Sequence, residues 1–248
     1  MKGDEPMEFQ IKDKYNVDDL REVVRILRAP GGCPWDREQT HESIRTDLIE
    51  ETYEVLDAID RQDVAGMEEE LGDLLMQVVF HSRIAEEAGR FDLDDVADGI
   101  CKKLIYRHPH VFADTKADTS EEVLKNWDAL KRVEKSQKTQ PDALNSVPRN
   151  FPALIRASKL QKKAGRGDWD WGSDEEALTR MENGLSAVKT AMQKGTGGEE
   201  AIGALLFAVV QCANRLGVDC EQSLTAVSNG FLEEFAAFEE EKMRKNRG

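Results

Sequence analysis

The residues of this 248-residue chain that could do chemistry are carboxylates gathered in one stretch. Residues 42–73 hold twelve acids and two basic residues, a balance of -10 out of the chain's formal -15. Within this stretch Glu51 and Glu54 stand three residues apart, as do Glu70 and Asp73. That spacing puts each pair on one face of a helix. Two short antiparallel helices would bring both pairs together.

The helical register distinguishes these acids from an ordinary solvated face. Most Glu-rich helices simply expose their acids to water. Glu51, however, shares its side of the helix with Leu48 and Val55, and Glu70 lies beside Leu74. We therefore expect the acids to point toward the interior of a helical bundle.

Carboxylates gathered in a bundle interior require a cation. At about 6 Å separation and an effective dielectric near 20, each pair repels by roughly 3 kcal/mol. Four such groups cannot all stay ionised without a metal or large pKa changes. Oxygen ligands without His or Cys favour Mg²⁺, with Mn²⁺ as a substitute, and Mg²⁺ characteristically links carboxylates to phosphates. Because the chain is acidic, we do not expect it to bind duplex nucleic acid. We expect any bound phosphate to be held through the metal.

The elements that position these acids are predicted to be helices. No stretch shows the period-two alternation and β-branched enrichment typical of strands. The expected fold class is therefore all-α, with two tandem helical bundles. Apolar residues recur with helical spacing over residues 17–28, 40–60, 64–88, 93–107, 119–137, 153–163, 174–194, 199–215 and 220–242.

A proline-rich segment and an internal repeat indicate two domains. ELGDLLMQVV of residues 70–79 aligns with AIGALLFAVV of residues 201–210, but Ala201 and Ala204 replace the acids. The second copy is thus expected to keep the packing and lose the chemistry. The predicted parts are an N-terminal tail (1–14), a catalytic domain (15–138), a Pro-containing linker (139–152), a degenerate, inactive domain (153–242) and a basic tail (243–248).

As a set, these motifs resemble the MazG family of nucleoside triphosphate pyrophosphohydrolases, helical Mg²⁺ enzymes that cleave a nucleoside triphosphate to the monophosphate and pyrophosphate. The blocks GCPWDREQTHESI, LIEETYEVLDAI, ELGDLLMQVVFHSRIAEE and RHPHVFAD look like those of the family, in the same order. The family's E-E-x-x-E and E-x-x-D stand here as Glu50, Glu51, Glu54, Glu70 and Asp73. The resemblance implies a metal held by the last four, catalytic roles for Glu50, Glu51 and Glu54, and a homodimer.

The resemblance also implies residues that hold the substrate. A phosphate-binding Lys and Arg four residues apart match Lys103 and Arg107, which would otherwise be interpreted as solvated helix residues. A nucleotide-binding Trp and Lys four residues apart match Trp127 and Lys131. These residue types fit their roles, because Arg binds phosphate as a planar fork and an indole can stack on a base.

Two further residues are candidates for the nucleotide pocket. Trp35 could line the base pocket or anchor its loop onto the bundle. His81 follows Glu70 and Leu74 on one helical stripe, so it could face the substrate or be a packed polar residue. His108, beside Pro109, is interpreted as structural.

The second half departs from the family pattern at each matched ligand. The resemblance places its E-E-x-x-E at residues 183–187, where the chain reads NGLSA, and its Lys and Arg at Gly230 and Glu234. No tryptophan follows Trp171. We therefore expect catalysis in the first half alone.

The expected reaction is attack of a metal-activated water on the α-phosphorus with release of pyrophosphate. The sequence does not identify the carboxylate that acts as general base, the preferred nucleobase and sugar, or the number of metal ions. An enzyme specialised for modified or deoxy nucleotides would carry the same site residues. The rival from another class is a non-enzymatic nucleotide sensor or oligomeric scaffold with a structural metal site. The charged start and the lack of a long apolar run predict a cytoplasmic protein without a membrane partner.

Overall fold

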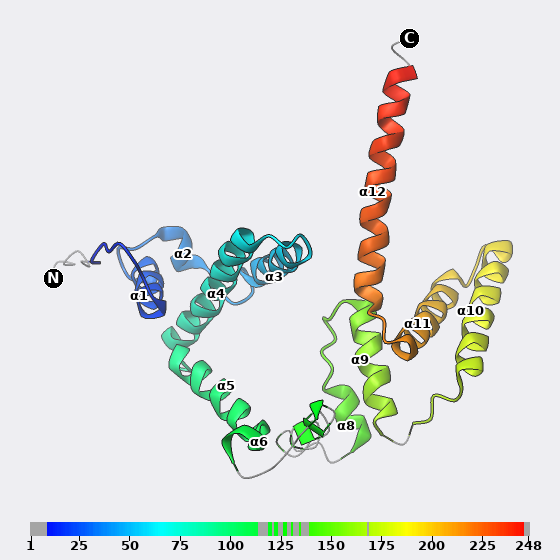
Figure 1. Cartoon of the computed structure of the whole chain (residues 1–248). Helices are drawn as coiled ribbons and strands as arrows, with labels where there is room; N and C mark the ends of the chain where they lie inside the picture. Colours follow the sequence, from blue (N-terminus) through cyan, green and yellow to red (C-terminus); the bar gives the residue numbers. More distant parts are fainter. Residues whose placement is uncertain are drawn as a thin grey trace. The chain divides into compact units, whose positions relative to one another are not determined.

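The computed structural model describes residues 9–113, 119–120, 122–123, 126–127, 130, 134, 139–167 and 169–245. Every regular element in these ranges is a helix, as Figure 1 shows. The all-α prediction is confirmed. By their contacts the residues divide into two units, Met1–Trp127 and Asp128–Gly248.

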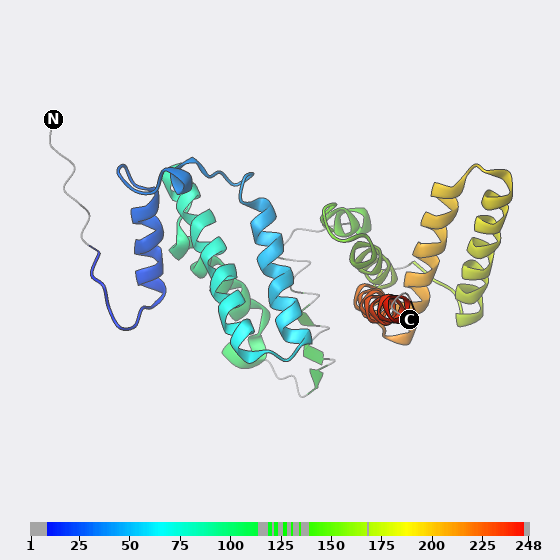
Figure 2. The same cartoon turned by 90° about the horizontal axis from the view of Figure 1, so that it is seen from above.

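The first unit is arranged around its longest helix, α4. Its helices are α1 (Val17–Arg28), α2 (Pro34–Glu38), α3 (Arg45–Asp60), α4 (Val64–Glu87), α5 (Leu93–Arg107) and α6 (Pro109–Phe112). Helices α1, α3 and α5 all pack against α4, and Figure 2 shows α3 lying alongside it. The buried core consists of Val24, Ile44, Val79 and Phe80.

Side-chain caps set where these helices begin. Asn16 starts α1 and Asp92 starts α5, each by a reciprocal bond with the acid three residues on. Asp63 accepts from the amide of Gly66 and starts α4 directly after the turn at 61–63. This tight turn makes α3 and α4 antiparallel, so their acidic faces meet.

A buried arginine fixes α2 and the following loop to the bundle. The side chain of Arg28 is 6% exposed and pairs with Glu87 on α4. Its Nη1 also donates to the backbone carbonyls of Asp36 and Gln39, at 2.5 and 3.1 Å. The guanidinium lies over the ring of Phe80. One side chain thus joins α1, α4 and the chain leading into α3.

The second unit also contains a closely packed helix pair. Its helices are α8 (Gln140–Asn145), α9 (Ala153–Gly165), α10 (Asp174–Lys194), α11 (Gly198–Leu216) and α12 (Cys220–Lys245). Helices α10 and α11 lie side by side (Figure 2), joined by a turn in which Gly195 and Gly197 have φ of 69° and 78°. Helix α9 packs on α11, and α12 packs on α9 without burying a residue of its own.

The helix limits differ from expectation where short polar side chains or prolines intervene. Helices at 17–28, 93–107 and 174–194 have the predicted limits. The helix expected over 40–60 begins only at Arg45, because the Thr40 and Ser43 hydroxyls accept from each other's backbone amides and hold a turn. The helix expected over 119–137 falls largely outside the described residues.

The segment expected as a linker, 139–152, contains helix α8. Thr139 caps this helix and Pro141 lies in its first turn, where a proline is tolerated. Ala143 and Val147 are buried, and α8 packs on α9. Proline there starts a short helix, as it also does at Pro34 in α2 and Pro109 in α6. The domain limits proposed from the sequence stay a prediction.

Among the described residues no single helix has the length and apolar character to cross a membrane. One pair bent by 106°, α11 with α12, meets that criterion together by length and composition alone.

Candidate metal centre

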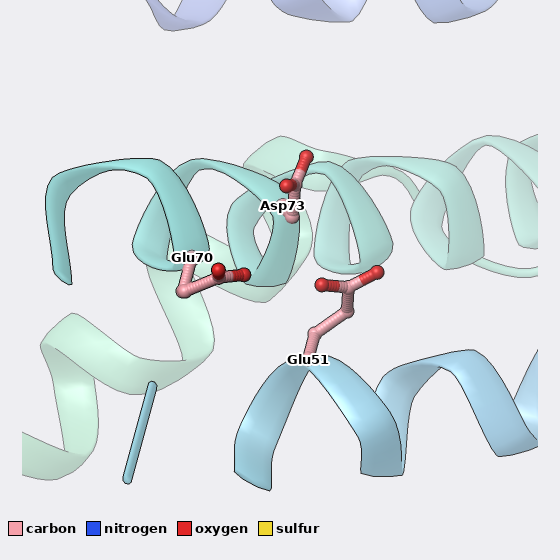
Figure 3. Close-up of side chains that lie close together, drawn as sticks. All are labelled: Glu51, Glu70 and Asp73. Atoms are coloured by element: carbon pink, nitrogen blue, oxygen red, sulfur yellow. The ribbon is translucent and has the colours of Figure 1, made fainter. Parts of the chain in front are cut away.

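Three carboxylates meet between α3 and α4. Glu51 extends from α3 toward Glu70 and Asp73, which stand one turn apart on α4 (Figure 3). One carboxylate oxygen of each lies within 4.8 Å of the others, and all three residues are half-buried. We call these residues the acid triad. Such a group of oxygen atoms can hold a hard divalent cation.

The surroundings of the triad disfavour its ionised form. Partial burial and the nearby charges of Asp73 and Glu54 raise the pKa of Glu51 above its ordinary value. Burial and the charges of Glu54, Glu69 and Asp73 likewise raise the pKa of Glu70. A bound cation would reverse both effects, because it stabilises the charged carboxylates.

The two remaining acids of the predicted set lie outside the triad. Glu54 is exposed, but it contributes to the raised pKa of both Glu51 and Glu70 and so belongs to the same acidic cluster. Glu50 is exposed and makes no such contribution among the described residues. The place of Glu54 in the coordination sphere stays a prediction.

The end of α5 brings two predicted substrate residues together. The guanidinium of Arg107 lies 5.3 Å from the centre of the Trp127 ring. His108 meets the same indole edge-on, with ring centres 4.8 Å apart, and its structural role stays a prediction. Lys103 is exposed one turn earlier on α5, whereas Lys131 lies outside the described residues.

The other two predicted pocket residues are placed differently. Trp35 on α2 is 62% exposed, with its backbone carbonyl held by the side-chain amide of Gln39. His81 on α4 is half-buried and stacks on His41, their rings nearly parallel and 5.2 Å apart. The two Nδ1 atoms are 2.9 Å apart, so one imidazole donates to the other.

Sequence reasoning missed Gln77 and His41. Gln77 is 5% exposed, and its Oε1 has no hydrogen-bond partner in the part of the chain that the structure describes. The Nε2 atom of His81 is also buried and also has no hydrogen-bond partner among the described residues. Asp73, Gln77 and His81 stand four residues apart in turn, so they share a ridge of α4. That ridge was visible in the sequence as polar residues on an apolar stripe.

The corresponding place in the second unit is filled by packing. Gly184, which aligns with Glu51, lies so close to α11 that a Cβ there would be 3.0 Å from the Cα of Leu205. Ala201, which aligns with Glu70, is buried. No carboxylate triad is found among the described residues of this unit. The helices close on each other where the first unit holds its acids.

Known proteins resemble this chain over most of its length. The family model described as "MazG nucleotide pyrophosphohydrolase domain" matches residues 39–112, which include the triad. A nucleoside triphosphate pyrophosphohydrolase of Escherichia coli (strain K12) is 42% identical over 228 residues, or 90% of this chain and 87% of that protein. The nucleoside triphosphate pyrophosphohydrolase/pyrophosphatase MazG of Thermotoga maritima is 40% identical over 223 residues, 90% of this chain and 85% of that protein.

Among solved structures, the crystal structure of a mazG-related protein from Thermotoga maritima is 30% identical, with a TM-score of 0.40. It covers 46% of this chain and 98% of that chain. Identity above 40% over nine-tenths of the chain, with the acids in their expected places, decides the assignment. The chain belongs to the MazG family.

Proposed function

We propose that this chain is a Mg²⁺-dependent nucleoside triphosphate pyrophosphohydrolase, acting on ribo- or deoxynucleotides and releasing the monophosphate and pyrophosphate. The acid triad between α3 and α4 carries the proposal. Its position inside the family-matched range, and the printed names of the relatives, support the same activity.

The residues present fit a hard cation. The donor set contains carboxylate oxygens only, which suits Mg²⁺ or Mn²⁺ better than zinc. The raised pKa values of Glu51 and Glu70 support a cation here, because a positive charge would offset the burial and the mutual repulsion that raise them. When bound, Mg²⁺ would supply Lewis acidity toward the α-phosphate and the attacking water.

Residues of this chain would accept the proton of the attacking water and neutralise the charge of the phosphate oxygens. Glu54 would accept the proton of the attacking water, which is supported by its exposure and by its effect on the pKa of both Glu51 and Glu70. Lys103 and Arg107 would neutralise the phosphate oxygens, Arg107 as a planar fork. Trp127, already in contact with Arg107, offers a ring on which a base can stack, and Lys131 follows on the family pattern.

A homodimer agrees with the apolar surface of the first unit. Leu56 on α3, Leu71 on α4 and Ile100 on α5 are each about half exposed. A monomer that left such residues in water would gain by covering them with a second copy. A cytoplasmic location stays a prediction from the sequence.

The test compares two neutralised acids on the same helix. Glu70→Gln should abolish release of pyrophosphate from ATP at saturating Mg²⁺, whereas Glu68→Gln, an exposed neighbour outside the triad, should keep it. In ¹⁸O-labelled water the label should enter AMP. Label in pyrophosphate instead would refute attack at the α-phosphorus.

The rival sensor or scaffold predicts a different outcome of the same experiment. A structural metal would leave the wild-type chain without turnover of any triphosphate, while Mg²⁺ still raised its melting temperature. Turnover that depends on Glu70 excludes this reading. A panel of canonical, deoxy and oxidised triphosphates would then identify the preferred substrate.

A further inference from the structure

Two buried polar atoms on one ridge of α4 have no hydrogen-bond partner in the part of the chain that the structure describes. They are Oε1 of Gln77 and Nε2 of His81, and no residue in the described ranges bonds to either. A buried polar atom without a partner costs stability, so natural proteins keep few of them and those few call for an explanation. A ligand that supplies the missing bonds is one explanation.

The ridge leads directly from the acid triad. Asp73, Gln77 and His81 are spaced by four residues, so each step moves about 6 Å along the helix axis. Because a sugar separates the α-phosphate of a nucleotide from its base, a base belongs about one to two turns from the metal-binding carboxylates. Gln77 and His81 occupy those turns.

The chemistry of the two atoms suits the edge of a heterocycle. Gln77 Oε1 accepts a hydrogen bond, as a base N–H or amino group would require. His81 Nε2 donates or accepts according to which imidazole of the His41–His81 pair carries the shared proton. Nε2 of His81 can thus act either as a hydrogen-bond donor or as an acceptor toward a base.

A short flap contacts the ridge at His81. Residues 40–43, which we call the flap, lie between α2 and α3 and carry His41. At one end Arg28 holds the carbonyl of Gln39, and at the other Ile44 is packed in the core. Between these anchors Thr40 and Ser43 bond mainly to the flap itself, and His41 reaches α4 through its contact with His81. A ligand can therefore reach the ridge by displacing the flap without unfolding a helix.

We propose that Gln77 and His81 hydrogen-bond the nucleobase of the substrate. This inference rests on the proposed function for the identity of the ligand. It assigns base recognition to the α4 ridge, apart from the stacking expected of Trp127.

Binding can be measured without turnover. The probes are α,β-methylene analogues of ATP, GTP, CTP and UTP, which the proposed reaction cannot cleave, and inorganic tripolyphosphate, which has no base. Calorimetry on the full chain with Mg²⁺ should show that Gln77→Leu lowers the affinity for the analogues by about tenfold. The affinity for tripolyphosphate should change by less than about twofold. The melting temperature of Gln77→Leu should not fall, because the substitution removes an unpaired buried oxygen.

The chain offers a matched control in another buried glutamine of similar exposure. Gln161 in α9 is 3% exposed, but its amide is fully engaged with Phe207 and Asn214. Gln161→Leu should therefore lower the melting temperature and leave binding of the analogues unchanged. If Gln77→Leu does not fold, His81→Phe, which keeps a ring, tests the same contact.

Three results would overturn the inference. One is analogue binding by Gln77→Leu within twofold of wild type, which would mean that the two atoms are satisfied by buried water alone. The second is wild-type affinity for tripolyphosphate equal to that for the analogues. The third, should Gln77→Leu not fold, is unchanged analogue binding by His81→Phe. Gln77-dependent analogue binding without pyrophosphate release from ATP would instead refute the proposed function and leave this inference standing.

Discussion

The guanidinium of Arg28 lies 2.8 Å from the carboxylate of Glu87 across two helices that are distant in sequence. Partial burial acts to raise the pKa of Glu87, but the hydrogen bonds and charges of Arg28 and Arg83 outweigh it and lower that pKa. The stabilisation is therefore present above the ordinary carboxyl range and is lost as the pH falls through the lowered value.

Removing this arginine should destabilise the first unit. Arg28→Met removes a donor from two backbone carbonyls and leaves Glu87 with Arg83 as its partner, at a cost of about 2 kcal/mol in the free energy of unfolding. Arg61→Met, which breaks a well-exposed pair with Asp57, should change it by less than about 0.5 kcal/mol. Urea unfolding followed by circular dichroism measures both; equal losses would contradict the role given to Arg28.

The metal-free protein should be strained by its own carboxylates. Because the pKa values of Glu51 and Glu70 are raised in the fold, the contribution of these two groups to stability becomes more favourable as the pH falls from neutrality toward the ordinary value of 4.5. At pH 8 without metal, Glu51→Gln should melt about 2 °C above wild type. The same variant should lose the increase in melting temperature that Mg²⁺ gives the wild type.

The control for that experiment is Glu68→Gln, which changes the charge equally outside the triad. It should keep the Mg²⁺ response. A wild-type melting temperature indifferent to Mg²⁺ would contradict the metal assignment.

His81 should contribute a loss of stability in mild acid, opposite in sign to the contribution of Glu51 and Glu70. Burial and the neighbouring His41 lower the pKa of His81 below its ordinary 6.5. The unfolded chain therefore takes up the proton first, and stability is lost as the pH falls from 6.5 toward the lowered value. Between pH 7.5 and 5.5, His81→Phe should lose less melting temperature than wild type, whereas His110→Phe should behave like wild type. The carboxylates contribute alike to all three chains, so the difference isolates His81.

Catalysis should belong to the first unit alone. A fragment of residues 1–138 keeps the acids and Lys103, Arg107, Trp127 and Lys131, whereas residues 139–248 keep α8 with α9 and none of the proposed ligands. Pyrophosphate release should follow the first fragment entirely. Its melting temperature or solution mass should differ from that of the full chain. Mg²⁺-dependent release by the second fragment would contradict the assignment of the catalytic site.

The sequence was informative where a local rule determines the outcome. The i, i+3 spacing of Glu70 and Asp73 and their register predicted the meeting with Glu51, because helix geometry leaves one arrangement for antiparallel neighbours. The limits of α1 followed similarly from the helical spacing of its apolar residues.

What the sequence could not provide depends on tertiary contacts. The sequence does not reveal whether the side-chain amide of a glutamine on an apolar stripe finds hydrogen-bond partners. Gln161 donates a hydrogen bond, whereas Gln77 Oε1 has no partner among the described residues. The stacking of His41 on His81 joins residues forty positions apart and has no local signature. Roles for Lys103 and Lys131 came only from the family resemblance.

The close approach at Gly184 has a consequence for the history of the second unit. A carboxylate restored at that position would place its Cβ 3.0 Å from the Cα of Leu205, closer than a side chain normally approaches a backbone. The helix pair must therefore shift slightly to accept even one acid, and one acid alone does not make a cation site. Loss of the site is thus easier than its recovery, because a single substitution can remove a ligand, whereas recovery needs several acids and a shift of the helices together.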